Sequence, residues 1–464
     1  MFEKEIYIHR RNVLKKEVGE GVILLPGNNE APMNYPSNTY KFRQDSNFLY
    51  YFGIDRPDLA GIIDVDNNQE IIFGDEFTID DIIWMGSQNT IAELSEKCGV
   101  LNTRTMKDLE QFLKNITNSN RTLHFLPQYR MDILLKISQY ISIPPAEVNQ
   151  NTSEKLIKSV IKQRSIKSEE EIEQIESAIE ISYLMNTAAM QLTQPGKIES
   201  EIFGVIEGIT LSIGNGVSFP VIFSVRGETL HNHNHENVMK NGDLALLDSG
   251  AESLLHYASD ITRTFPVNGK FTSKQKDIYN IVLNSQINAI ELCGPGVKFK
   301  DIHLETAKII ADGLKSCGLM KGNVEDAVSA GAHALFFPHG LGHMLGLDVH
   351  DMEGLGENLV GYGSDESRSD QFGLAYLRLA KELRPGFTVT IEPGIYFIPE
   401  LINLWKSENK FSEFINYSRL EEYKKFGGIR IEDDILITES GSRVLGKIPI
   451  PKSVTDVEET CQTQ

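Results

Sequence analysis

Four strand-like segments of this chain each carry an acidic residue among apolar neighbours. A carboxylate that is buried alone is costly and normally takes up a proton, whereas a bound metal ion removes that cost. The fold must therefore either bring these acids together or leave each one as a solvated or capping residue. The acids are Asp248 in LALLDS, Asp260 in HYASDITRTFP, Glu392 in TVTIEPGIY and Glu432 in GIRIEDDILI.

A histidine-rich segment between the second and third acids adds further side chains that can bind metal. Residues 338–351 read PHGLGHMLGLDVHD and include His339, His343 and His350. His339 and His343 are four residues apart, but the glycines around them argue against a regular helix. Carboxylates combined with a histidine suit a dinuclear site for divalent ions. The spacings alone leave ordinary capping acids and hydrogen-bonded histidines as the open alternative.

Composition argues against several classes of partner and site. Lys and Arg number 45 against 65 Asp and Glu, a net charge of −20, so the surface would repel nucleic acids and anionic membranes. The four cysteines lack CxxC spacing, which argues against a disulfide framework or a thiolate zinc site. We see no secretory signal and no run of 18 apolar residues, and we therefore expect a cytoplasmic protein without a membrane span.

The hydrophobic patterns predict two domains joined by a short helical linker. Residues 1–153 alternate short apolar runs with helical spacing, which predicts an α/β domain. Within it, residues 21–25 (GVILL) suit a buried strand, and residues 60–65 with 71–73 suit a hairpin. Residues 154–166 are expected to form the linker, and residues 167–464 the second domain.

The second domain is expected to be α+β with an antiparallel sheet, because helices alternate with short strands bounded by turn signals. Two long polar segments, 351–384 and 399–427, are predicted to be irregular functional loops or insertions. Helices are expected at 170–192, 199–212, 273–293 and 299–314, and strands at 243–248, 258–266, 387–392 and 429–438.

These segments resemble the pita-bread metallopeptidase family and, within it, the aminopeptidase P and prolidase branch. HYASDITRTFP, HGLGHMLGLDVHD, TIEPGIY and GIRIEDDILIT occur in the family's order, and YKFRQDSNFLYYFGID at 40–55 resembles the branch's accessory domain. The resemblance covers nearly the whole chain. It implies an α+β pita-bread catalytic domain preceded by a smaller, creatinase-like α/β domain.

The resemblance implies five metal ligands for two divalent ions: Asp248, Asp260, His343, Glu392 and Glu432. Asp260 and Glu432 would bridge the ions, Asp248 would complete one shell, and His343 with Glu392 would complete the other. We expect Mn²⁺ by resemblance, although the ligand chemistry also permits Co²⁺, Zn²⁺ or Fe²⁺.

The resemblance also implies a set of catalytic and substrate-binding side chains: His231, His339, His350, Glu392, Arg378 and Arg430. Glu392 would shuttle a proton, His231 and His350 would donate hydrogen bonds to developing charge or position the substrate, and His339 would line a proline pocket. Arg430 would support the site. His231, His233 and His235 alternate, which could instead indicate a separate metal patch, but we expect only His231 in the active site.

The implied activity is that of an Xaa-Pro aminopeptidase, in which a hydroxide bridging two ions attacks the bond before proline. This bond is a tertiary amide without an N–H, so a ring-shaped pocket must replace the missing hydrogen bond. An Xaa-Pro dipeptidase stays open, because Arg378 in GLAYLR resembles a prolidase arginine that holds the substrate carboxylate; a surface ion pair is its ordinary alternative. A non-catalytic pita-bread binding module is a remote alternative, since such relatives lack some of the five ligands.

Some features depart from the family pattern or concern assembly. The stretch between Asp248 and Asp260 is one residue longer than usual, and segments 351–384 and 399–427 are expanded. Trp84 in DIIWMGSQ resembles an aromatic residue that a neighbouring subunit contributes in some relatives, with core packing as the alternative. Relatives are commonly dimers or tetramers, so a homo-oligomer is expected.

Overall fold

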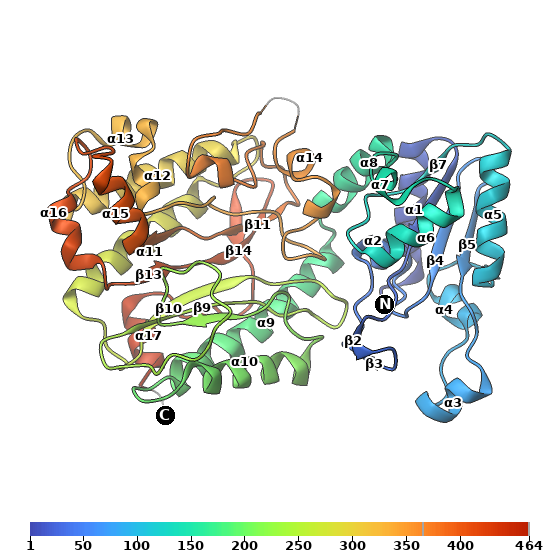
Figure 1. Cartoon of the computed structure of the whole chain (residues 1–464), viewed down its shortest axis with the longest axis horizontal. Coiled ribbons are helices and arrows are strands. Elements are labelled where there is room, and N and C mark those ends of the chain that lie inside the picture. Colours follow the sequence, from blue (N-terminus) through green and yellow to red (C-terminus); the bar gives the residue numbers. More distant parts are fainter. Residues whose placement is uncertain (364–365, 463–464) are drawn as a thin grey trace. The chain divides into compact units, whose positions relative to one another are not determined.

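The computed structural model describes residues 1–363 and 366–462 (Figure 1). The chain divides into an N-terminal unit, Met1–Arg164 with Gly354–Gly356, and a C-terminal unit, Ser165–Glu353 with Glu357–Gln464. In this described part of the chain, no helix has both the length and the apolar composition needed to cross a membrane.

The N-terminal unit is built on a five-stranded mixed sheet with the order β6-β5-β4-β1-β7. The central pairs β1–β4 and β4–β5 are antiparallel, and the outer pairs β5–β6 and β1–β7 are parallel. The hairpin expected at 60–73 is present as β4 and β5. The strands are β1 (Val22–Pro26), β4 (Ala60–Asp64), β5 (Gln69–Phe73), β6 (Asn102–Arg104) and β7 (Leu123–His124); β2 (Pro32–Tyr35) pairs separately with β3 (Asn38–Thr39).

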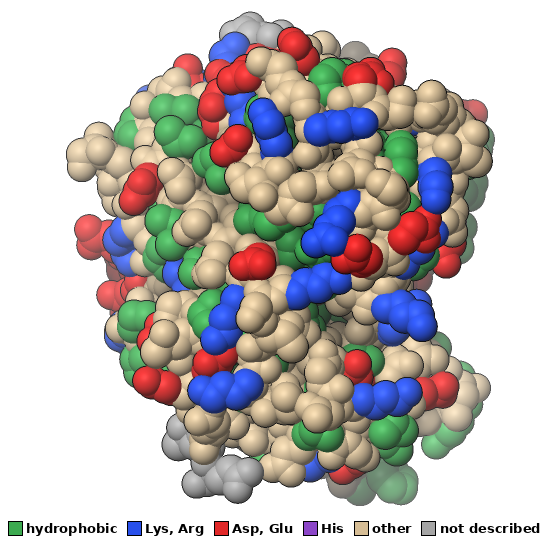
Figure 2. Space-filling model, turned by 90° about the vertical axis from the view of Figure 1, so that its left-hand side faces the viewer, with side chains coloured by type: hydrophobic (Ala, Val, Ile, Leu, Met, Phe, Trp, Pro, Cys, Tyr) green, Lys and Arg blue, Asp and Glu red, His purple; other side chains and the backbone are tan. Residues whose placement is uncertain are grey.

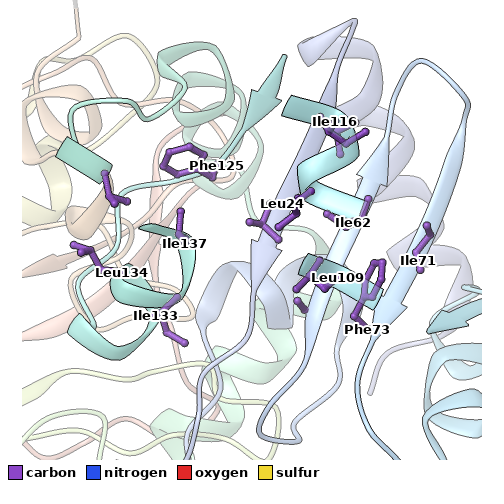
Figure 3. Packing of buried hydrophobic residues seen from close by; sticks show 14 residues of the cluster. Leu24, Ile62, Ile71, Phe73, Leu109, Ile116, Phe125, Ile133, Leu134 and Ile137 are labelled. Atoms are coloured by element: carbon purple, nitrogen blue, oxygen red, sulfur yellow. The ribbon is translucent and has the colours of Figure 1, made fainter. Parts of the chain in front are cut away.

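Helices α5 (Met106–Asn118) and α6 (Met131–Ile141) cover the sheet of this unit with an apolar face (Figure 3). Leu109, Leu113 and Ile116 recur on one side of α5, so they pack together against Phe73 and Ile62. The other helices are α1 (Lys4–Val18), α2 (Ser46–Phe52), α3 (Ile79–Met85), α4 (Ile91–Lys97), α7 (Pro145–Val148) and α8 (Glu154–Ser165).

The C-terminal unit contains short antiparallel ladders, as the strand and turn pattern predicted. One sheet has the order β10-β9-β8, a second has the order β11-β14-β15, and β12 pairs with β13. The strands are β8 (Ile222–Ser224), β9 (Leu244–Ser249), β10 (Ile261–Pro266), β11 (Thr388–Ile391), β12 (Gly394–Tyr396), β13 (Gly428–Arg430), β14 (Asp433–Ile437) and β15 (Ser442–Val444).

Long helices flank these ladders (Figure 1). Helix α9 (Glu169–Leu192) contacts β9 and β10, whereas α11 (Ser273–Leu292) contacts β11, β13 and β15 and packs on α12 (Phe299–Ser316). A capping box of Ser168 and Glu171 begins α9, as expected from the sequence SEEE. The remaining helices are α10 (Glu199–Ile213), α13 (Val324–Ala330), α14 (Glu357–Gly361), α15 (Pro399–Ser407), α16 (Tyr417–Leu420) and α17 (Val454–Thr460), with 3₁₀ turns η1 (Ala332–Leu335), η2 (Glu353–Leu355), η3 (Leu374–Tyr376) and η4 (Glu421–Tyr423).

The two long polar segments differ from each other. The described residues of segment 351–384 form only α14 and short 3₁₀ turns, so its irregular character is as predicted. The prediction of an irregular 399–427 was wrong, because this segment forms α15, α16 and η4. Helix α15 begins with Pro399, whose fixed φ suits the first turn, and it buries Ile402 and Trp405.

Surface charge on the visible face of the molecule is mixed in sign. Figure 2 shows Lys and Arg side chains interspersed with Asp and Glu over this face rather than gathered in one region. The described residues on this face therefore do not form a single basic area.

Candidate active site

A cavity of about 680 Å³ lies in the C-terminal unit, and all the site residues predicted from the sequence line it. The volume is in the range that holds a small peptide or drug-sized ligand. The predicted residues that meet there are His231, Asp248, Asp260, His339, His343, His350, Arg378, Glu392, Arg430 and Glu432.

The antiparallel ladders bring the acids together. Asp248 lies in β9 opposite Thr262 of β10, and Asp260 directly precedes β10. Glu432 lies between β13 and β14, where its backbone N–H donates to the Thr262 carbonyl at 3.1 Å. Glu392 follows β11, and its N–H donates to the Leu341 carbonyl at 2.8 Å. Pairing between distant strands thus places acids from four segments around one space.

His343 is held with one ring nitrogen facing the acids. Its Nδ1 is 3.0 Å from the Met344 carbonyl, which can only accept, so Nδ1 carries the proton. The other nitrogen, Nε2, lies 3.4 Å from Asp260 Oδ2 and 3.7 Å from Glu392 Oε1. Ligand atoms of Asp260, His343 and Glu432 all lie within 4.8 Å of one another. A neutral imidazole aimed in this way can accept a metal ion.

Three carboxylates of this cluster each have one oxygen atom without the hydrogen bond that a buried charge normally has. Within the described residues, Asp248 Oδ1, Asp260 Oδ1 and Glu432 Oε1 are buried without a hydrogen bond. Burial and neighbouring carboxylates raise the pKa values of Asp260 and Glu432 well above their usual range, and burial raises that of Glu392. Divalent cations fit this donor set, since they would satisfy these oxygens and cancel the repulsion.

A hydrogen-bonded network behind the cluster holds Arg430 against it. The Arg430 guanidinium donates to Asp248 Oδ2 at 2.5 Å, to the Tyr396 hydroxyl at 2.8 Å and to Thr262 Oγ1 at 3.1 Å. Thr262 then donates to Glu432 Oε2 at 2.6 Å. Tyr396 and Thr262 were not identified from the sequence, although Tyr396 stands in the motif TIEPGIY.

His339 is fixed in the same network by two hydrogen bonds. Its Nδ1 donates to the Gly340 carbonyl at 2.8 Å, so its Nε2 accepts from the Tyr396 hydroxyl at 2.8 Å. Burial, the charge of Arg430 and other neighbours lower the pKa of His339 to about 3. The ring is therefore neutral at physiological pH and offers the cavity an uncharged wall.

His350 and Arg378 share one carboxylate. The His350 ring stacks on His343 with 3.8 Å between ring centroids, and its Nδ1 donates to Glu353 Oε1 at 2.9 Å. Arg378 Nη1 donates to the other oxygen, Glu353 Oε2, at 2.6 Å. Burial and nearby His343 lower the pKa of His350 to about 4. With its proton on Nδ1, neutral His350 presents Nε2 as an acceptor.

The remaining predicted positions fall in different surroundings. His233 lines the cavity with His231, but His235 stacks on Phe203 and its Nδ1 lies 3.0 Å from the Phe223 carbonyl. Among the described residues, no group of three metal-ligating side chains is found at these histidines. Trp84 on α3 is 86% exposed, so the core-packing alternative for it was wrong.

Segment 351–384 also lines the cavity, which the sequence predicted only as a functional loop. Its contribution is mixed in charge and aromatic: Glu357, Arg368, Phe372, Tyr376 and Arg378. From α15 and the residue before it come Leu401 and Ile398. The two expanded segments therefore form part of the binding surface.

Comparisons with known proteins identify the family of both parts of the chain. Residues 173–439 match metallopeptidase family M24, and residues 7–124 match the aminopeptidase P N-terminal domain. The human Xaa-Pro dipeptidase is 31% identical over 447 residues, which cover 94% of this chain and 88% of that protein. A probable Xaa-Pro aminopeptidase of Metarhizium acridum is 32% identical, over 96% of this chain and 85% of its own.

A solved structure has the same fold over the whole length. Escherichia coli aminopeptidase P with the inhibitor Pro-Leu superimposes with a TM-score of 0.82 at 30% identity, and the match covers 99% of this chain and 98% of that one. Aminopeptidase and dipeptidase relatives are thus about equally similar to this chain.

Proposed function

Because this chain belongs to metallopeptidase family M24 and has the two-domain aminopeptidase P fold, we propose that it is an Xaa-Pro aminopeptidase. It would release the first residue from peptides whose second residue is proline. The observation that carries the proposal is the convergence of four acids and His343 on one cavity, with buried carboxylate oxygens that lack partners.

Five side chains would hold two divalent ions: Asp248, Asp260, His343, Glu392 and Glu432. Asp260 and Glu432 are the most buried of the four acids and would lie closest to both ions, and we expect manganese. When bound, the ions polarise the scissile carbonyl and lower the pKa of the attacking water. The Thr262 hydroxyl and Arg430 orient Glu432 and Asp248, so the ligands are fixed before binding.

The other residues of the cavity would bind substrate and move a proton. Glu392 takes a proton from the attacking water and delivers it to the proline nitrogen as the C–N bond breaks. His339, with the apolar side chains of Phe219 and Ile222, provides a neutral surface for the proline ring. His350 Nε2 positions substrate by accepting an N–H, since its own proton is held on Nδ1. His231, which lines the cavity beside these residues, would donate a hydrogen bond to developing charge or position the substrate.

The test compares Ala-Pro-Ala with Ala-Ala-Ala as substrates of the purified protein. We expect hydrolysis of the proline peptide only, its loss after chelation, and its return when manganese is added. Metal content should fall from two ions per chain when Asp260 and Glu432 are both replaced by alanine. Undiminished cleavage by that variant would rule out the two-ion site.

An Xaa-Pro dipeptidase is the second candidate, because Arg378 lines the cavity and could hold a substrate carboxylate. The ratio of kcat/KM for Ala-Pro to that for Ala-Pro-Ala separates the two activities. A non-catalytic binding module would cleave neither peptide. Assembly into a homo-oligomer and a cytoplasmic location stay predictions.

A further inference from the structure

Glu353 joins two lining residues of the cavity through one carboxylate. Oε1 accepts from His350 at 2.9 Å, and Oε2 accepts from Arg378 at 2.6 Å. The Glu353 side chain is 20% exposed and stands at the start of η2, directly beside the cavity wall. The Glu353 carboxylate is therefore already paired with the Arg378 guanidinium, the group that would attract a substrate carboxylate.

Glu353 and Arg378 form an ion pair in which the two charges cancel. Burial alone would raise the pKa of Glu353, but the hydrogen bond from His350 and the charges of its neighbours, Arg378 among them, lower it. Glu353 is therefore ionised at neutral pH and neutralises Arg378. A second carboxylate on the remaining Arg378 donors would lie beside Glu353 and be repelled in a partly buried site.

The other arginines of the cavity are occupied in the same way. Arg368 donates to Glu357 at 2.6 Å, and Arg430 donates to Asp248 at 2.5 Å. Among the three, Arg378 has the most exposed side chain, 39% against 29% for Arg368 and 4% for Arg430. Arg378 is thus the most exposed of the three cations, and its carboxylate contact is with Glu353.

Substrate length determines whether a carboxylate or a neutral amide lies near Arg378. An Xaa-Pro dipeptide carries its carboxylate on the proline itself, whereas a longer peptide has a neutral amide there. On the basis of the proposed Xaa-Pro activity, we infer that Glu353 is a specificity-determining residue: by occupying Arg378, it disfavours dipeptides and directs the enzyme to peptides of three or more residues.

The test replaces Glu353 with glutamine, which keeps the shape and one acceptor oxygen but removes the charge and turns the other oxygen into an NH₂ donor. We expect the ratio of kcat/KM for Ala-Pro to that for Ala-Pro-Ala to rise at least about tenfold, through a lower KM for the dipeptide. Adding Arg378→Ala to Glu353→Gln should return the ratio to the wild-type value, because the gain depends on the freed guanidinium.

Glu176→Gln is the matched control. Glu176 also accepts from an arginine, Arg443, at 2.6 Å, and its side chain is 16% exposed while that of Arg443 is 43% exposed. This pair does not line the cavity among the described residues. The control should leave the ratio unchanged, so a shift common to both variants would show a general charge effect and overturn the inference.

A measurement on the wild-type enzyme keeps the inference testable if Glu353→Gln does not fold. The amide Ala-Pro-NH₂ should be cleaved faster than Ala-Pro, since it lacks the repelled charge. Equal cleavage of the two, or an unchanged ratio in Glu353→Gln with both rates reduced, would mean that Glu353 only positions His350. If the wild type cleaves no Xaa-Pro peptide, the proposed function itself fails.

Discussion

Glu432 and Asp433 are consecutive and both buried, yet their surroundings are opposite. The Asp433 carboxylate accepts from Arg263 at 2.6 Å, Lys452 at 2.6 Å and Gln286 at 2.8 Å. Glu432 receives one hydrogen bond from Thr262, and within the described residues its Oε1 has no partner. Asp433 is thus paired with positively charged side chains of the chain itself, whereas Glu432 is not.

The protonation behaviour of the two acids follows from this difference. Burial would raise the pKa of Asp433, but the charges of Arg263 and Lys452 hold it at about 2. Burial and the carboxylate of Asp260 raise the pKa of Glu432 well above its usual range. A buried acid with its own cations is costly to remove, because its partners are left uncompensated, whereas a buried acid among other acids needs a cation from outside.

The largest effect on activity is expected from replacing an acid that, like Glu432, has a buried oxygen without a hydrogen bond. Asp260→Asn should lower kcat/KM for Ala-Pro-Ala at least about a thousandfold, because a metal ligand supplies several kcal/mol to the transition state. The same change should not lower the melting temperature of the chelated protein, since it relieves repulsion. Activity assays and thermal unfolding in EDTA check both results. A strongly destabilised chelated variant would show that Asp260 has a structural role.

Removing the charge of Asp433, which is paired with Arg263 and Lys452, should instead lower the stability of the protein. Asp433→Asn leaves buried Arg263 without its counter-ion, so we expect the free energy of unfolding to fall by about 3–5 kcal/mol. Trp405 is 3% exposed and Trp84 is 86% exposed, so fluorescence during urea unfolding reports mainly the C-terminal unit. A change below about 1 kcal/mol would remove the distinction between the two acids.

His303, a buried base, allows the same comparison to be made through the pH dependence of stability. Burial, with His333 nearby, lowers the pKa of His303 on α12 to about 3, and in the described chain its ring nitrogens have no partner. Unfolded histidine binds a proton below about pH 6.5, so stability is lost as pH falls below that value, by about 1.4 kcal/mol per pH unit. His303→Phe should therefore unfold with a shallower pH dependence between pH 6.5 and 4. Parallel curves for variant and wild type would contradict this.

The smallest effect is expected at a surface ion pair. Glu176→Gln breaks the contact with half-exposed Arg443 and should change the free energy of unfolding by less than about 1 kcal/mol. Urea titration of this variant beside Asp433→Asn compares exposed and buried pairs at the same donor–acceptor distance of 2.6 Å.

Local patterns in the sequence were sufficient to predict the strands that carry the acids. The apolar runs before Asp248 and Glu392 end in turn signals, and both features depend only on neighbouring residues. Contacts between distant segments could not be predicted in this way. Tyr396 bonds Arg430 across 34 positions and Thr262 bonds Glu432 across 170, and no local pattern marks either pair.

Segments 399–427 and 351–384 show two further limits. Composition suggested irregular chain for 399–427, but burial of Ile402 and Trp405 stabilises α15 through tertiary packing. Glu353 was not identified, since its role depends on side chains three and twenty-five residues away that meet only in the folded chain.

Segment 351–384 lines the cavity yet contains no strand of the ladders among its described residues. The segment that shapes part of the cavity wall is therefore separate in the chain from the strands that lead to the acids. Substrate preference and catalysis can be altered separately in such an enzyme. Evolution, or a protein engineer, can exchange the segment that lines the cavity so that new peptides bind, while the acids that support hydrolysis stay the same.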